Sequence, residues 1–133
     1  PLPLSALLSL PVAHCTVVDP LPLPSLPSVT RVLACAEDYV GPMVDEVWGY
    51  NVLQHVRDPS AVLATAKRHA RYVVRWFDWT DTPLAEHHPH SVSADWIAGH
   101  FSRADGWRLT TETRGQIASP LPQSYIALVA ERT

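Results

Sequence analysis

The chain has little of the residues that define several common classes of small protein. Its 133 residues include only two cysteines, Cys15 and Cys35, which form neither a Cys-x-x-Cys pair nor a zinc-ligand spacing. Both lie in apolar, strand-like surroundings, so we interpret them as small core residues without a redox role. Such sparse cysteine is typical of a protein of the reducing cytoplasm.

Basic charge is also scarce. Lysine and arginine number 10 against 13 acidic residues, and the formal net charge is -3. Nucleic-acid-binding proteins usually carry a strongly basic face, so the composition gives no support to nucleic acid as a partner. Residues 1–13 are apolar, but they lack the basic start of a signal peptide and are too short and proline-broken to span a membrane. The first residue is not methionine, which predicts a piece of a longer protein.

The residues that are present indicate one globular domain of the α/β class. Hydrophobic residues make up 47% of the chain and charged residues 17%, which is typical of a packed core. Continuous apolar runs predict buried parallel strands at 15–19, 31–36, 44–50 and 72–78. Two further runs have no helix between them and predict an antiparallel pair at the sheet edge, at 107–113 and 124–130.

Helix signals lie between these strands. Asp58 is a good N-cap and Pro59 suits the first helical position. Ser93 predicts the start of a second helix, with Ile97 and Phe101 on its buried face. The order of strands and helices therefore predicts a mostly parallel sheet with helices packed against it.

Polar residues end three of the predicted strands. Asp19 follows the first, Glu37 and Asp38 follow the second, and Tyr50 and Asn51 follow the third. In open α/β sheets, ligands bind in the crevice outside the carboxyl ends of the strands, so these side chains are candidates for one binding site. Asp19 has a simpler alternative, because Asp before proline also forms turns.

Several motifs, in a consistent order, carry a resemblance to a known family. The chain resembles class I methyltransferases that use S-adenosylmethionine (SAM), and it is most similar to a group of small, uncharacterised methyltransferase-like proteins of phage type. The matching motifs are Glu37-Asp38, the run DEVWGYNVLQHVRDP at 45–59, Trp79 to Pro83, and Glu86 to His90. The resemblance implies a Rossmann-like sheet and SAM as the cofactor.

The resemblance also implies roles for the strand-end residues. Asp19 would accept hydrogen bonds from the ribose hydroxyls, as the acid of dinucleotide folds does. Glu37 or Asp38 would accept the adenine amino group. Tyr50 and Asn51 would lie beside the methyl group and the acceptor.

One part of the family pattern is missing. Class I methyltransferases begin with a strand and a glycine-rich turn that approaches the cofactor closely, and this chain has no glycine before Gly41. Residues 3–8 resemble the start of the helix that follows this turn. We therefore expect residues 1–133 to form a single, N-terminally truncated methyltransferase domain. The missing strand would leave unpaired backbone, or 15–19 and 44–50 would pair directly.

The acceptor side is predicted from the remaining polar motifs. His55, His88 and His90 are the candidate catalytic residues, with Asp81 and Glu86 as candidates for binding the acceptor. His55 has two alternatives: a general base, or a hydrogen-bond partner of a loop. The acceptor is a small molecule or another group that the sequence does not identify.

The loop at 86–90 has three interpretations. It could cover the substrate, form a structural hydrogen-bonded loop, or bind zinc through Glu86, His88 and His90, although no second cluster has ligand spacing. The alternatives to a methyltransferase are a non-catalytic remnant of the fold and a small metal-binding protein built on this loop.

Overall fold

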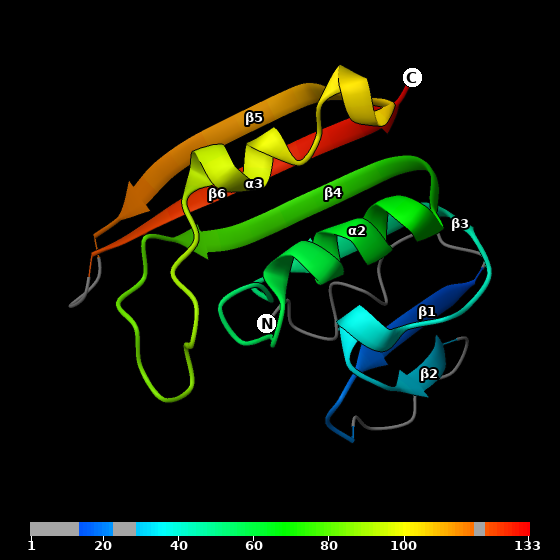
Figure 1. Ribbon diagram of the computed structural model, residues 1–133, viewed down its shortest axis with the longest axis horizontal. Helices are drawn as coiled ribbons and strands as arrows, with labels where there is room; N and C mark the ends of the chain where they lie inside the picture. Colours follow the sequence, from blue (N-terminus) through cyan, green and yellow to red (C-terminus); the bar gives the residue numbers. More distant parts are fainter. Residues whose placement is uncertain (1–13, 23–28, 119–121) are drawn as a thin grey trace.

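The computed structural model describes residues 14–22, 29–118 and 122–133. The predicted helix start at 3–8 lies outside these residues. The elements run in the order β1 (Cys15–Asp19), β2 (Val29–Leu33), η1 (Ala36–Asp38), β3 (Val44–Tyr50), α2 (Pro59–His69), β4 (Ala70–Thr80), α3 (Ala94–Gly99), η2 (Arg103–Asp105), β5 (Trp107–Ile117) and β6 (Gln123–Arg132) (Figure 1).

The strands form two hydrogen-bonded sheets. β1 and β2 pair in parallel, and a four-stranded sheet has the order β3-β4-β6-β5. In the larger sheet β3 and β4 are parallel, whereas β6 is antiparallel to both β4 and β5. The predicted mixture of parallel strands and a final antiparallel pair is confirmed. In the described part of the chain β1 and β3 belong to separate sheets, so the direct pairing of these two strands is not formed.

One predicted strand ends too late. We expected it at 31–36, but β2 covers Val29–Leu33. The prediction is wrong at this end because the backbone turns after Leu33: the Ala34 N–H donates to the Val32 carbonyl at 3.1 Å, and Ala36–Asp38 form a 3-10 turn. The apolar residues after Leu33 resemble a strand in sequence. In the structure, Ala36–Asp38 instead form a turn that lies beside α2.

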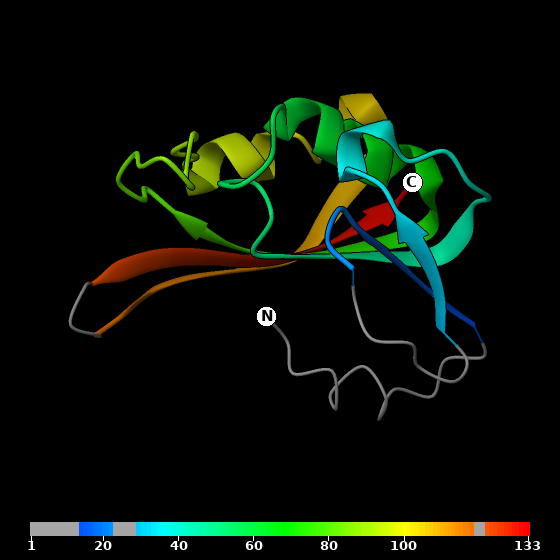
Figure 2. The ribbon, with the colours of Figure 1, turned by 90° about the horizontal axis from the view of Figure 1, so that it is seen from below.

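Helices α2 and α3 cover one face of the larger sheet (Figure 2). Both begin as predicted, because the Asp58 side chain accepts the Ala61 N–H and the Ser93 side chain accepts the Trp96 N–H. The core between the helices and the sheet is formed by buried apolar side chains, among them Leu53, Leu63, Val74, Ile97, Phe101, Trp107 and Ile126.

Gly49 is required by this packing. A Cβ atom built at Gly49 would overlap the ring of Trp76 on the neighbouring strand. A larger residue would therefore displace a core indole beside the end of β3.

Within the described residues, none of the helices has the length and apolar character needed to cross a membrane.

Candidate functional site

The connection between β3 and α2, residues 51–58, is the centre of the candidate site. It begins at Asn51, which has a left-handed backbone with φ of 52°. Asn tolerates this conformation better than most residues. The Asn51 N–H donates to the Phe77 carbonyl at 2.8 Å, so the turn starts while the backbone is still bonded to β4. The predicted tip at Tyr50 and Asn51 is thus held at the carboxyl end of the sheet.

Asp78, near the end of β4, binds the backbone of this connection through hydrogen bonds. Its Oδ2 accepts the N–H groups of Val52 at 3.1 Å and Leu53 at 3.0 Å. It also accepts the indole N–H of Trp76 at 3.2 Å. Asp78 is 0% exposed. Burial raises the pKa of its carboxyl group, and the hydrogen bonds offset only part of that effect.

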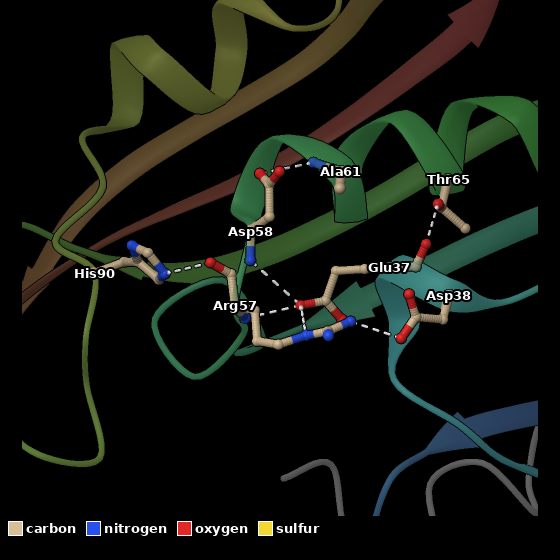
Figure 3. Close-up of polar contacts among 7 residues, drawn as sticks. All are labelled: Glu37, Asp38, Arg57, Asp58, Ala61, Thr65 and His90. Atoms are coloured by element: carbon tan, nitrogen blue, oxygen red, sulfur yellow. Dashed lines mark hydrogen bonds and ion pairs between the residues drawn. The ribbon is translucent and has the colours of Figure 1, made fainter.

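Glu37 holds the other end of the same connection. Its Oε1 accepts the Arg57 N–H at 2.8 Å and the Asp58 N–H at 3.3 Å (Figure 3). Burial alone raises its pKa, but the backbone hydrogen bonds and the charge of Arg57 together outweigh burial and lower the pKa of Glu37. Arg57 also pairs with Asp38 at 2.6 Å. The acids after β2 therefore lie directly beside the start of α2.

His55 joins the connection to the loop at 85–90. Its Nδ1–H donates to the His87 carbonyl at 2.9 Å, and its ring lies edge-on to His88 at 4.7 Å between centroids. The Nε2 of His55 accepts from Gln54 Nε2 at 3.1 Å, and the same Gln54 nitrogen donates to Asn51 Oδ1 at 2.7 Å. Both ring nitrogens of His55 are thus bonded, which favours its loop-holding alternative.

The loop at 85–90 reaches the connection at a second point. His90 Nε2–H donates to the Arg57 carbonyl at 3.1 Å (Figure 3). The loop is also closed on itself by reciprocal backbone bonds between Ala85 and His88. His55, His88 and His90 therefore come together in one region, as a loop packed across residues 51–58.

Three other predicted site residues have different contacts. The Asp19 carboxylate accepts the Leu21 N–H at 2.7 Å, which is the turn that its Asp-Pro sequence allows. The ring of Tyr50 stacks on the ring of Phe77, with centroids 4.9 Å apart. Glu86 is exposed. The structure gives none of these three a hydrogen bond to the 51–58 connection.

Asp81 lies at a separate hollow. It has φ of 54° just after β4, at the rim of an open depression of about 500 Å³. This hollow is lined by Thr80, Asp81, Ala94, Arg114, Gly115, Gln116, Ser124 and Tyr125. It lies where the carboxyl end of β4 meets the last two strands.

The metal alternative finds no geometric support. Across residues 14–22, 29–118 and 122–133, no three His, Cys, Asp or Glu side chains are grouped as metal ligands. In particular, His90 is turned to the Arg57 carbonyl and His88 to the His55 ring.

Sequence reasoning missed three residues that organise the site. The apolar run predicts Asp78 only as part of a strand, although an acid at an inward position between Trp76 and Thr80 is a signal of a buried acceptor. Arg57 precedes the N-cap and links both acids after β2. Gln54 connects Asn51 to His55. The contacts of Asp78 and Arg57 join residues far apart in the sequence, so no local pattern could reveal them.

Several solved structures with the same fold are methyltransferases. The N-methyltransferase NodS from Bradyrhizobium japonicum, in complex with S-adenosyl-L-homocysteine, matches with a TM-score of 0.67 at 10% identity, over 90% of this chain and 66% of that chain. Magnesium protoporphyrin IX methyltransferase from Synechocystis, with bound S-adenosylhomocysteine, matches with a TM-score of 0.61 at 13% identity, over 80% of this chain and 52% of that one. The chain therefore has the class I SAM-dependent methyltransferase fold.

The same fold also carries other chemistry. The [4+2]-cyclase SpnF matches with a TM-score of 0.62 at 10% identity, over 79% of this chain and 56% of that chain. The chain spans between half and two thirds of the length of these first three structures. No family model matches the sequence, and no curated protein matches it.

Proposed function

We propose that this chain is the later part of a SAM-dependent methyltransferase of the small phage type, which transfers a methyl group to an acceptor in the cytoplasm. The fold it shares with SAM methyltransferases is the observation that carries the proposal. The arrangement of the β3–α2 connection supports it, because Asp78 and Glu37 bond the backbone on either side of His55 at the carboxyl end of the sheet. Methyl transfer needs mainly such positioning and the exclusion of water.

The residues present fit one half of the cofactor. Asp38 is exposed beside the start of α2. Its Oδ2 pairs with Arg57, and its Oδ1 can accept the adenine amino group, whereas Glu37 is already bonded to two backbone N–H groups. Asp19 ends β1 and uses Oδ1 for the Leu21 N–H, so Oδ2 remains for a ribose hydroxyl. Tyr50 and Asn51 border the site from β3. When bound, SAM supplies a methyl group activated on a sulfonium.

The acceptor side of the proposal rests on the packed histidine loop. His88 and His90 flank the β3–α2 connection, and His55 orients the loop through the His87 carbonyl. Asp81 lies at the open hollow beyond β4, where it can accept a hydrogen bond from the acceptor. Glu86 is exposed on the same loop and is assigned to the same role.

We further propose a strand that is not among the described residues. Within the described residues, β1 has no partner on the side away from β2, and β3 has none on the side away from β4. Two such edges leave rows of unpaired N–H and C=O groups. A strand from residues upstream, ending in a glycine-rich turn, would pair with both edges and complete the cradle for the methionine end of SAM.

Calorimetric titration with SAM tests the proposal on two proteins: this chain, and the chain extended upstream by its own coding frame. We expect the extended chain to bind SAM and this chain to bind it poorly, because the methionine end lacks its backbone contacts. Tight, stoichiometric binding by this chain would contradict the missing cradle. Absence of binding by both would favour the alternative, a non-catalytic remnant of the fold.

A substitution in the extended chain separates the cofactor site from general stability. Asp19→Ala removes charge-assisted hydrogen bonds to the ribose, so SAM affinity should fall by about 1–3 kcal/mol. Asp45→Ala is the matched control, because Asp45 is an exposed acid paired only with Arg71. Equal affinity in the two variants would remove Asp19 from the site.

A further inference from the structure

β5 forms an outer edge of the larger sheet and has features of a pairing surface (Figure 1). It is 11 residues long, more than twice the five residues of β2 at the edge of the small sheet. From Thr111 to Ile117 it pairs with β6 without interruption, and its one irregularity lies before that, between Leu109 and Thr111. In the described part of the chain nothing pairs with its outer side.

Exposed edges of this length are usually blocked. Natural proteins protect them with proline, lysine, bulges or short strands, because unpaired N–H and C=O groups otherwise bind another strand. Residues 111–117 contain no proline and no lysine. The bulge leaves this seven-residue segment regular, so every second residue presents its backbone groups outward.

The side chains of this segment divide between two faces. Arg114 contacts Asp95 of α3 at 2.7 Å, which places Arg114, and with it Glu112, on the helix-covered face. Thr111, Thr113 and Gly115 alternate with these residues and lie on the opposite face. There a Cβ at Gly115 would lie 2.7 Å from the Tyr125 hydroxyl, so the Tyr125 ring covers the glycine.

We propose that β5 pairs antiparallel with β5 of a second copy of this chain, about a two-fold axis at Thr113. In this register Thr113 faces Thr113 of the second copy. Glu112 then faces Arg114 of the second copy, and the symmetry repeats that pair on the other side of the axis. Opposite charges directly across antiparallel strands stabilise pairing. The contact is isologous, so it closes as a dimer.

Neighbouring registers are disfavoured by the same charges. An axis at Glu112 would place two glutamates opposite each other, and an axis at Arg114 would do the same with two arginines. Like charges directly opposite destabilise a strand pair, whereas the axis at Thr113 produces none. Within the uninterrupted segment 111–117, the charge pattern is therefore complementary to itself in one register.

The pairing would extend the sheet from four strands to eight. Two-fold axes of antiparallel strands are perpendicular to the sheet, so the helices of both copies would cover the same face. Thr111 would then face Gly115 of the second copy, next to the Tyr125 ring that covers it. This contact lies outside the β3–α2 connection, and the inference does not depend on the proposed enzymatic activity.

Sedimentation equilibrium over a range of micromolar concentrations tests the dimer. We expect the full chain to approach twice the mass of one copy. Glu112→Arg and Arg114→Glu should each return it to one copy by placing like charges opposite each other. The double variant, Glu112→Arg with Arg114→Glu, should restore the dimer. Arg103→Glu is the charge-matched control away from the edge and should change nothing, and circular dichroism verifies folding.

Cysteine substitution tests the register itself. In the proposed dimer Thr113→Cys places two thiols directly across the axis, within the span of a disulfide. Oxidised glutathione should therefore link this variant into a covalent dimer. Thr111→Cys, on the same face of the same strand, should remain largely unlinked, as should the parent with Cys15 and Cys35.

Three results would overturn the inference. The first is a parent chain that keeps the mass of one copy throughout the concentration range. The second is a dimer that both single charge reversals leave intact, or that the folded double variant fails to restore. The third is equal linking of the Thr113→Cys and Thr111→Cys variants, because pairing in the proposed register brings only the first pair of thiols together.

Discussion

Asp78 and Glu37 perform the same task at opposite ends of one connection, yet their surroundings affect them in opposite ways. Each carboxylate accepts two consecutive backbone N–H groups between β3 and α2. Asp78 is fully buried and has only neutral donors, so burial dominates and its pKa is raised. The Glu37 side chain is 6% exposed, but its backbone hydrogen bonds, with a smaller contribution from the charge of Arg57, outweigh burial and lower its pKa.

The comparison teaches that hydrogen bonds alone do not decide the protonation of a buried acid. Both carboxylates have two backbone donors, and Asp78 has an additional indole donor. The strength of the burial effect makes the difference: burial dominates at Asp78, whereas at Glu37 the backbone hydrogen bonds and, to a smaller extent, the charge of Arg57 outweigh it. Asp78 is therefore held at an electrostatic cost, whereas Glu37 stabilises the fold as an anion. Substitutions at the two acids should reproduce this difference.

The largest effect is expected from Asp78→Ala. This change leaves the N–H groups of Val52 and Leu53 without an acceptor in a buried place, which costs roughly 2–4 kcal/mol of unfolding free energy. Denaturant unfolding measures the loss. Asp45→Ala, at an exposed ion pair, should change the same quantity by less than about 1 kcal/mol. Equal losses in both variants would show that Asp78 does not hold the connection.

Glu37→Ala should have a smaller effect. The N–H groups of Arg57 and Asp58 belong to exposed residues, so water can replace part of the lost acceptor. We expect a loss of about 1–2 kcal/mol at neutral pH in the same unfolding experiment. A loss larger than that of Asp78→Ala would reverse the comparison.

The pH dependence should have opposite signs at the two acids. Because the pKa of Asp78 is raised in the folded state, the folded protein binds more protons than the unfolded chain above about pH 4, and stability falls as pH rises through that window. Asp78→Asn removes this dependence while its amide oxygen still accepts the two N–H groups. The free energy of unfolding of the variant should therefore increase relative to that of the parent as pH rises.

Glu37→Gln should behave in the reverse manner. The lowered pKa of Glu37 contributes stability that is fully present above the unfolded value, about pH 4.3, and is lost as pH falls through the folded value. The penalty of Glu37→Gln should thus be clear at neutral pH and vanish in acid. Unfolding curves recorded across the acid range test both variants, and slopes of the same sign would refute the contrast.

The smallest effect is expected from Arg57→Met. Arg57 is 70% exposed at its side chain, so its ion pairs with Glu37 and Asp38 are screened by solvent. The loss of stability should be below about 1 kcal/mol. A more specific measurement is the pKa of Glu37, followed by NMR. This pKa should rise toward its ordinary value in the variant. An unchanged pKa would assign the shift to the backbone hydrogen bonds alone.

The sequence by itself determined the local features of this protein. Apolar runs predicted the strands, and Asp58 and Ser93 marked the starts of α2 and α3, because strand burial and helix caps depend on neighbouring residues. The order of the elements and the resemblance of the 45–59 motif led to the correct fold class. The strand predicted at 31–36 was misplaced because an apolar run does not mark where the backbone turns.

The tertiary structure alone decided which distant groups meet. Asp78 contacts backbone 25 and 26 residues away, and His55 contacts the backbone of a loop 32 residues away. Only the chain path makes Asp78 an acceptor for the β3–α2 connection and brings the His87 carbonyl to Nδ1 of His55. The separation of β1 and β3 into two sheets is equally non-local, because backbone pairing depends on which strands lie adjacent in space and not on their own residues.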